Sequence, residues 1–367
     1  MKIGILTHYY KSTNYGGNLQ AYALAKFLCD RGFDAEQICY KRINDLLFGN
    51  RSCPQNIFIT FAKQAVNWIR KWNINKRNMY IRQFNQDEIP HSRTVYTKDT
   101  LHALGDKYDL LIVGSDQVWH PKAVCDAYLL KFQTNAKRIA YAASFAVDFI
   151  EPEIADYYRD CLKQFNAISV RESEGQALVK RICGRNADLV LDPTLLLAKS
   201  DWETIIEPAN IGSDYIFCYF LGNSMKQRSI AQQFADKIHL PIVNLPYLNG
   251  RNNVDRQFGK YRLFDVSPCR LLYLIQNAKF VFTDSFHATV FSILFGTRFF
   301  TFERNGMSSR LRTLTDIFNL QAHFCNDENK MTLDYLVKMA EDMDISMDKF
   351  NLLRRQSEHF LMTNLVN

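Results

Sequence analysis

The sequence predicts an α/β protein with two domains, each built on a parallel sheet. Short apolar runs of strand length alternate with helical patterns along most of the chain, and this alternation is typical of parallel sheets covered by helices. The chain has 367 residues, which suits two domains of ordinary size. Several predicted strands end in glycine, serine or aspartate, and open parallel sheets bind ligands at that end.

Composition and cysteine usage restrict the class of protein. The chain is 47% hydrophobic and 23% charged, as expected for a globular protein in water, and it has no apolar run long enough to span a bilayer. Its first residues run directly into a predicted strand, without the layout of a signal peptide. The nine cysteines are scattered, and no pair has CxxC spacing. We therefore expect a reduced, cytoplasmic protein without disulfide bonds, a metal site or a bound cofactor.

The first domain is expected to open on a strand, a glycine-containing loop and a helix. Residues 2–7 form an apolar run, and Asn14-Tyr-Gly-Gly-Asn-Leu-Gln20 leads from it into a helical pattern over residues 21–31. Glycines between a strand and a helix let backbone amides approach a ligand, but the spacing is not GxGxxG and does not indicate a dinucleotide. Two interpretations are open. The segment is a tight turn, or it binds sugar hydroxyls through Asn14, Gly17, Asn18 and Gln20.

A basic, aromatic segment interrupts this domain at about residues 50–85. Between Lys41 and Arg82 there are nine basic residues and one acid. Six apolar positions fall on one helical face: 57, 61, 65, 68, 69 and 72. A basic amphipathic helix with tryptophans suits an anionic membrane surface or a lipid-linked anion; the alternative is a helix whose apolar face packs on its own domain. No nucleic-acid motif accompanies the segment, so nucleic acid is not an expected partner.

Three later strands of the first domain end in polar residues. One ends at Gly114-Ser115-Asp116, the next ends at Ser144, and a third ends at Arg171. Asp116 is either a helix cap or a group that orients or deprotonates a hydroxyl. Arg171 either pairs with a neighbouring glutamate or holds a carboxylate or phosphate bidentately.

The second domain is expected to start near residue 199 and to repeat the alternation. Predicted strands cover residues 214–222, 240–245, 280–282 and 298–302, and a polar loop is expected at 247–264. The last predicted helix, about residues 347–361, is expected to return to the first domain. These boundaries divide the chain into residues 1–198, 199–345 and 346–367.

The segment from Lys279 to Gly296 carries the sharpest functional signal. An apolar run is followed by turn and cap residues, and then by a helical pattern that ends at Gly296. His287 falls in the first helical turn, where free backbone N–H groups and the helix dipole favour an anion. A histidine beside an anion suits acid/base chemistry on a phosphorylated or carboxylated substrate. The alternative is a core histidine that binds a backbone carbonyl.

Six short motifs occur in order along the chain: Asn14-Tyr-Gly-Gly-Asn-Leu-Gln-Ala-Tyr-Ala-Leu24, Val113-Gly-Ser-Asp-Gln-Val-Trp119, Tyr141-Ala-Ala-Ser144, Ser169-Val-Arg-Glu172, Leu191-Asp-Pro-Thr194 and Thr283-Asp-Ser-Phe-His-Ala288. Together they resemble the polysaccharide pyruvyl transferase family. The resemblance implies an α/β, GT-B-like fold, with two Rossmann-type domains whose parallel sheets face a central cleft.

The family resemblance also implies an activity. A member moves the pyruvyl group of phosphoenolpyruvate onto two hydroxyls of one sugar and releases phosphate, during synthesis of a capsule, exopolysaccharide or cell-wall polymer. No cofactor is needed. Acceptors of this kind are often lipid-linked, which suits peripheral contact with the inner face of the plasma membrane.

The chemistry of this reaction suggests roles for individual residues, since the donor carries two anionic groups and ketal formation needs an acid and a base. His287 is expected to be the acid, Arg171 the anion clamp, and Asp116 the base or hydroxyl-orienting group. Some members resemble Arg-Leu-His where this chain has Ser285-Phe286-His287, so another residue must replace that arginine. The candidate donor-binding residues are Arg171, Ser285, Ala288, Arg298 and Arg310, with Arg304 also available. The candidate acceptor-binding residues are Asn14, Gly17, Asn18, Gln20, Ser115 and Ser144.

Two other functions are open. A GT-B glycosyltransferase is expected to bind a nucleotide sugar and not phosphoenolpyruvate. A non-catalytic family member, altered at Ser285, is expected to bind a saccharide or a partner protein without releasing phosphate.

Overall fold

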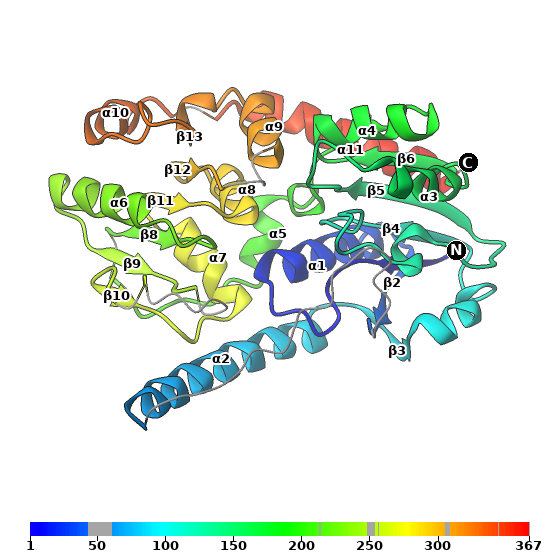
Figure 1. The fold of residues 1–367 in the computed structure, drawn as a ribbon, viewed down its shortest axis with the longest axis horizontal. Helices are drawn as coiled ribbons and strands as arrows, with labels where there is room; N and C mark the ends of the chain where they lie inside the picture. Colours follow the sequence, from blue (N-terminus) through cyan, green and yellow to red (C-terminus); the bar gives the residue numbers. More distant parts are fainter. Residues whose placement is uncertain are drawn as a thin grey trace. The chain divides into compact units, whose positions relative to one another are not determined.

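The chain forms two compact units in the computed structural model (Figure 1). The structure describes residues 1–42, 61–212, 214–247, 254–255, 257–304, 309–343 and 345–366, and over residues 61–71 it describes the helix but no side chains. The first unit contains Met1–Ser52, Phe84–Leu197 and Met347–Asn367, and the second contains Cys53–Gln83 and Ala198–Ser346.

The first unit is built on a seven-stranded sheet with the order β3-β2-β1-β4-β5-β6-β7. Every described strand pair in it is parallel. The strands are β1 Lys2–Leu6, β2 Asp34–Tyr40, β3 His91–Tyr96, β4 Leu110–Val113, β5 Lys137–Ala143, β6 Ala167–Val170 and β7 Asp188–Leu189. The helices are α1 Tyr15–Cys29, α3 Pro152–Leu162, α4 Ser173–Cys183 and α11 Met347–Val366, with the 3₁₀ turns η1 Lys98–Leu104, η2 Asp126–Leu129 and η3 Pro193–Leu195.

Buried aromatic side chains fill the core on one side of this sheet. Trp119 is fully buried, and its ring packs against those of Phe145 and Phe165 at centroid distances of 5.2 and 5.8 Å. Its indole N–H donates to the Tyr128 carbonyl at 3.0 Å, and the Tyr158 hydroxyl donates to the Trp119 carbonyl at 2.7 Å. The polar atoms of these side chains are thus satisfied, as burial requires.

The C-terminal helix α11 belongs to the first unit. Its Ser357 hydroxyl accepts a hydrogen bond from the Leu191 N–H at 2.9 Å. The ring of Phe360 lies 6.3 Å from that of Tyr141, and the Asn364 carbonyl accepts from Lys137 at 2.7 Å. These contacts anchor the middle and the C-terminal end of the helix to the first unit.

The second unit has a six-stranded sheet with the order β10-β9-β8-β11-β12-β13, also parallel at each described pair. The strands are β8 Ile216–Tyr219, β9 Ile242–Asn244, β10 Tyr261–Arg262, β11 Phe280–Thr283, β12 Phe299–Phe302 and β13 Phe324–Cys325. The helices are α2 Phe61–Asp87, α5 Lys199–Glu203, α6 Met225–Lys237, α7 Pro268–Gln276, α8 Phe286–Phe295, α9 Ser309–Ile317 and α10 Leu333–Met339, with η4 Gln321–His323. The last turn of α2, from Phe84, belongs to the first unit.

The central strands of the second sheet, β8, β11 and β12, are buried at every residue and mostly apolar, as expected for a parallel sheet covered on both faces. Phe234 of α6 packs on three strand residues, Phe280, Phe282 and Phe300, at ring distances of 5.1, 5.2 and 5.9 Å. On α8, the ring of Phe291 lies edge-on to that of Trp202 at 4.9 Å. These contacts pack β11 and α8 into the interior of the second unit, and α8 carries His287.

The basic segment is assigned differently from the sequence prediction, which placed about residues 50–85 in the first domain. Residues 53–83 belong to the second unit because α2 is bonded to it. Arg77 donates to the carbonyls of Phe264 and Pro246, both at 3.0 Å, and Lys76 pairs with Asp265 at 2.5 Å.

The apolar face predicted for this helix lies largely outside what the structure describes. Position 57 is outside the described residues, and the side chains at 61, 65, 68 and 69 are not described. The sixth position, Trp72, is 55% exposed. None of the described helices is both long and apolar enough to cross a membrane.

Candidate functional site

Both sheets have the strand order of a Rossmann fold, and each therefore has one point where the chain reverses its direction of winding. In the first unit this point lies between β1 and β4, and in the second it lies between β8 and β11. Open parallel sheets bind ligands outside the carboxyl ends of the strands at this point. The residues that follow β1, β4, β8 and β11 are thus the candidates for function, and each unit is described on its own.

In the first unit a buried ion-pair group follows the carboxyl ends of β4 and β6. Arg171 donates from one terminal nitrogen to Asp116 at 2.9 Å and from the other to Asp192 at 2.6 Å. The Arg171 side chain is 1% exposed, Asp192 is fully buried, and the Asp116 side chain is 12% exposed. Of the three groups, Asp116 is therefore the one that a ligand can reach.

Charge compensation keeps Arg171 positively charged. Burial alone lowers the pKa of Arg171, but Asp192 and Asp116 outweigh it and raise that pKa above its usual value. The hydroxyl of Ser115 donates to the Ala142 carbonyl at 2.8 Å, and its oxygen lies 3.3 Å from a carboxylate oxygen of Asp192. A positive charge shared by two carboxylates holds Asp116 in one orientation.

This geometry changes the role expected for Arg171, which was predicted to clamp the donor's anion. Both of its terminal nitrogens already bind carboxylates, and its side chain is closed to solvent. The structure thus supports the salt-bridge alternative, although the partners are Asp116 and Asp192 and not the neighbouring glutamates. Glu172 instead accepts from the N–H groups of Phe145 and Ala146 at 2.8 and 3.2 Å.

The glycine-containing segment is helical, whereas the sequence predicted a loop that extends to Gln20. Helix α1 begins at Tyr15 because the Asn14 side chain caps it, accepting from the N–H groups of Gly16 and Gly17 at 3.0 and 3.3 Å. A Cβ atom at Gly17 would lie 3.0 Å from the His8 carbonyl oxygen and 3.5 Å from a carboxylate oxygen of Asp116. Glycine therefore lets α1 approach the Asp116 carboxylate closely.

Two predicted acceptor residues on α1 are buried and bonded inside the protein. The Asn18 amide donates to the Ser12 carbonyl at 3.2 Å and accepts from Asn85 at 3.1 Å. Gln20 donates to Thr7 at 2.9 Å and accepts from the Ser115 N–H at 3.1 Å. Both residues are 0% exposed, so they shape the site and do not offer groups to a sugar.

Ser144 and His8 complete the carboxyl edge of the first sheet. Ser144 follows β5, its N–H donates to the Asp116 carbonyl at 3.0 Å, and its hydroxyl is buried with no hydrogen-bond partner in the described part of the chain. His8 follows β1 and was not among the predicted site residues. Its position just beyond the end of the first strand, at the reversal point, is the signal that would have identified it.

In the second unit the cap of α8 forms as predicted. The Ser285 hydroxyl accepts from the Ala288 N–H at 3.5 Å, and the backbone N–H of Ser285 donates to the Thr283 hydroxyl at 3.0 Å. Thr283 in turn donates to the Tyr219 carbonyl at 2.6 Å, which ties β11 to β8. His287 lies half-buried in the first turn of α8, where backbone N–H groups and the helix dipole favour an anion.

A buried carboxylate, that of Asp284, lies at the reversal point of the second sheet. Asp284 accepts from the N–H groups of Leu221 and Gly222 at 2.5 and 2.8 Å. A Cβ atom at Gly222 would lie 2.8 Å from that carboxylate, so a larger residue there would displace it. Burial raises the pKa of Asp284, and these hydrogen bonds and the charge of Arg304 partly oppose the shift.

The structure separates the candidate donor arginines into two groups. Arg310 on α9 is buried, with its guanidinium 5.6 Å from the ring of Phe286 in the first turn of α8, and Arg304 follows the carboxyl end of β12. Arg298 precedes β12, and its carbonyl accepts from the Val281 N–H at 2.8 Å. Arg298 thus lies at the amino ends of the strands, whereas His287 lies at their carboxyl ends. The structure does not bring Arg298 to the candidate site.

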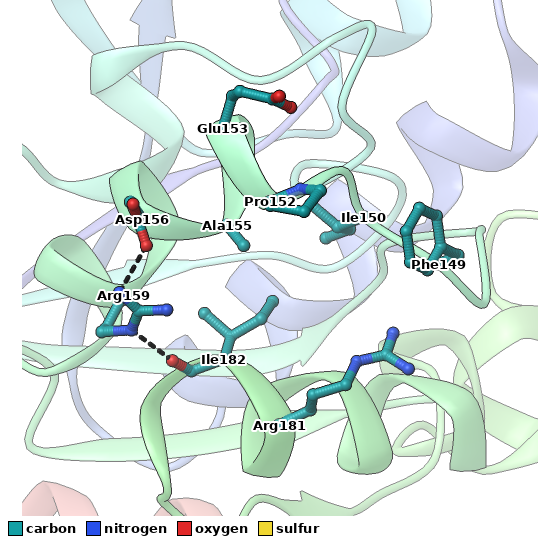
Figure 2. Close-up of a pocket in the computed structure, with 9 residues that line it drawn as sticks. All are labelled: Phe149, Ile150, Pro152, Glu153, Ala155, Asp156, Arg159, Arg181 and Ile182. Carbon is teal, nitrogen blue, oxygen red and sulfur yellow. Dashed lines mark hydrogen bonds and ion pairs between the residues drawn. The ribbon is translucent and has the colours of Figure 1, made fainter.

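A cavity of about 410 Å³ lies elsewhere on the first unit, along α3 and α4 (Figure 2). It is lined by Phe149, Ile150, Pro152, Glu153, Ala155, Asp156, Arg159, Arg181 and Ile182. Arg159 is held by Asp156 and by the Ile182 carbonyl. None of the predicted site residues lines it. Within the described residues, no group of three or more histidine, cysteine or acidic side chains could hold a metal ion.

Two parallel α/β sheets with this strand order define the class of protein as a GT-B-like enzyme fold. The chain is similar to UDP-GlcNAc 2-epimerase from Neisseria meningitidis (TM-score 0.50, 8% identity, covering 100% of both chains) and from Methanocaldococcus jannaschii (TM-score 0.51, 12% identity, covering 94% of this chain and 92% of that one). It is also similar to S. aureus MnaA in a structure with UDP (TM-score 0.53, 9% identity, covering 96% and 91%). These likenesses show the fold and confirm that part of the prediction.

The family model for polysaccharide pyruvyl transferase matches residues 14–306. The chain therefore belongs to the polysaccharide pyruvyl transferase family, as its six motifs predict. No curated protein matches the sequence.

Proposed function

We propose that the protein transfers the pyruvyl group of phosphoenolpyruvate onto two hydroxyls of one sugar and releases phosphate. The observation that carries the proposal is His287 in the capped first turn of α8, in a chain whose family is that of the polysaccharide pyruvyl transferases. Phosphoenolpyruvate carries a phosphate and a carboxylate. A helix N-terminus with a titratable group and a nearby arginine suits both anions.

The donor is assigned to the second unit. The first turn of α8 binds one anionic group through backbone N–H, and Arg310 or Arg304 takes over the charge that an arginine at position 285 supplies in some relatives. Ser285 is the helix cap in this arrangement. His287 protonates the methylene carbon of the donor as the first sugar oxygen bonds to the neighbouring carbon.

The acceptor is assigned to the first unit, where Asp116 is the reachable member of a fixed ion-pair group. The first hydroxyl adds across the donor double bond, and the second then displaces phosphate at the same carbon. One hydroxyl proton leaves to a base at this site while His287 supplies the proton of the new methyl group. The second hydroxyl proton leaves with the phosphate, so that atoms and charge balance.

Phosphoenolpyruvate is expected to stabilise the protein against heat, and Arg310→Met is expected to abolish that stabilisation. A ligand at ~100 times its dissociation constant adds about 2.7 kcal/mol to the free energy of unfolding. The measurement is a thermal-shift comparison of phosphoenolpyruvate with nucleotide sugars, each variant being referred to its own melting temperature without ligand. Arg298→Met is the matched control, because Arg298 lies at the opposite edge of the sheet.

Each outcome of this comparison decides between functions. Stabilisation by phosphoenolpyruvate in the wild type and in Arg298→Met, but not in Arg310→Met, supports the donor and its site. Stabilisation by a nucleotide sugar alone indicates a GT-B glycosyltransferase. If neither stabilises the protein, a non-catalytic saccharide-binding role takes precedence.

We also propose that α2 contacts an anionic membrane surface, which suits a lipid-linked acceptor. Trp72 and Met79 are 55% and 53% exposed, and their spacing of seven residues places them on one face of the helix. Lys76 lies 5.4 Å from the Trp72 ring, and Arg82 is exposed one turn beyond Met79. Tryptophan with flanking basic residues is typical of helices that lie in a membrane interface.

The wild type is expected to co-sediment with liposomes that contain anionic lipid at low salt, and to be released by salt because the attraction is screened. Trp72→Ala together with Met79→Ala is expected to weaken this binding. Leu352→Ala, which removes a comparably exposed apolar side chain from α11, is the control. Equal sedimentation of the double variant, or none of the wild type at low salt, removes the membrane proposal.

A further inference from the structure

We infer that His8 is the group that accepts the proton of the acceptor hydroxyl, and that Asp116 orients the reaction without itself being the base. This inference rests on the proposed pyruvyl transfer and adds a residue that neither the motifs nor the family match assigns.

The first argument is position. His8 follows β1 after one intervening residue, and Asp116 follows β4 after two. Strands β1 and β4 are neighbours at the reversal point of the first sheet, where ligands bind in folds of this type. Gly17 at the start of α1 approaches both the His8 carbonyl and the Asp116 carboxylate. The two side chains therefore follow adjacent strands at one edge of one sheet.

The second argument is an unsatisfied nitrogen. The Nε2 atom of His8 is covered, yet it has no hydrogen-bond partner among the residues that the structure describes. The ring itself is held, since it lies edge-on to Tyr128 with ring centroids 4.5 Å apart. A covered polar atom without a partner costs free energy. A sugar hydroxyl that donates to Nε2 would supply the missing hydrogen bond.

The third argument compares His8 with Asp116 as bases. Asp116 is tied to Arg171 at 2.9 Å, and an ion pair that stabilises a carboxylate makes it a poorer proton acceptor. His8 has no such bond at Nε2. When His8 gains a proton, the negative charge of Asp116 stabilises the resulting imidazolium, which is the orienting and stabilising role that a carboxylate commonly has beside a histidine base.

Burial favours the neutral form of His8 at rest. Burial lowers its pKa to about 4, and Asp116 opposes this shift while Arg42, His120 and Arg171 add to it. At neutral pH the imidazole is therefore unprotonated and able to accept a proton. The proton passes from the hydroxyl to Nε2 as the sugar oxygen bonds to the donor carbon, and His8 later releases it to solvent.

The test uses the whole protein labelled with ¹⁵N-histidine, and a panel of methyl glycosides as acceptor probes. The His8 signal is assigned by its loss in His8→Asn, and His102→Asn, at an exposed histidine, is the control. We expect the His8 Nε2 signal of a neutral imidazole at pH 7, and we expect it to move when a glycoside binds. With phosphoenolpyruvate and that glycoside, phosphate release should fall by roughly 10²–10⁴-fold in His8→Asn and stay unchanged in His102→Asn.

Two results overturn the inference. One is an Nε2 signal that no glycoside moves. The other is a folded His8→Asn variant that releases phosphate at nearly the wild-type rate. Failure of the proposed function is recognised separately, because in that case phosphoenolpyruvate does not stabilise the wild type or His8→Asn. Retained stabilisation by phosphoenolpyruvate in His8→Asn shows that the donor site is intact and that any loss lies on the acceptor side.

Discussion

His287→Ala is expected to lower the rate of phosphate release from phosphoenolpyruvate by roughly 10²–10⁴-fold, the usual contribution of a general acid. The side chain lies in the first turn of α8, where it can reach an anion held by the backbone N–H groups. Removing the imidazole leaves these N–H groups and the Ser285 cap in place, so the donor should still bind. The loss is therefore expected in kcat more than in the KM for phosphoenolpyruvate.

Three measurements separate an acid from a structural histidine at this position. The melting temperature of His287→Ala should stay near that of the wild type, since His287 is only half-buried. His359→Ala, at an exposed histidine of α11, should retain full activity. In D₂O the wild type should place one deuterium in the methyl group of the product. Near-normal turnover in His287→Ala, or a product methyl without deuterium, would rule out the assigned role.

The central strands of both sheets were predictable from the sequence because burial on both faces makes them continuous apolar runs. Residues 280–282 and 298–302 are examples, and both lie in the second sheet. The strands at the edges of the sheets were not predictable in the same way. β10 is Tyr261–Arg262, with both residues exposed, and it lies in a segment predicted to be a loop. β3 has three exposed residues in succession. An edge strand that is short and half exposed carries no apolar run.

The candidate site residues also fall into those that a local sequence pattern predicts and those that depend on the sheet. A local pattern predicted the position of His287, because a cap residue and a helix start can be read from neighbouring residues. The ion-pair group could not be predicted in this way, because Asp116, Arg171 and Asp192 are 21 to 76 residues apart and only the parallel register brings them together. Arg298 is a different case, because the strand predicted over residues 298–302 already begins at this arginine, and β12 begins one residue later.

Arg171→Met is expected to lower the free energy of unfolding by roughly 3–5 kcal/mol, because removing one partner from a buried ion pair leaves an uncompensated charge. Here two carboxylates lose their partner, and the Asp192 side chain is fully buried. The measurement is urea unfolding, compared with Arg355→Met at an exposed arginine of α11. The control should change stability by no more than a few tenths of a kcal/mol.

The double variant Arg171→Met with Asp192→Asn distinguishes an ion-pair role from a donor clamp. If Arg171 serves chiefly to neutralise the two carboxylates, removing the Asp192 charge as well should recover part of the lost stability, since residues in one network couple by 0.5–3 kcal/mol. Phosphoenolpyruvate should still stabilise each variant that folds, because the donor is assigned to the second unit. A donor clamp predicts the reverse, with nearly unchanged stability and no response to phosphoenolpyruvate. The short contacts of Arg171 with both carboxylates, at 2.9 and 2.6 Å, favour the first result.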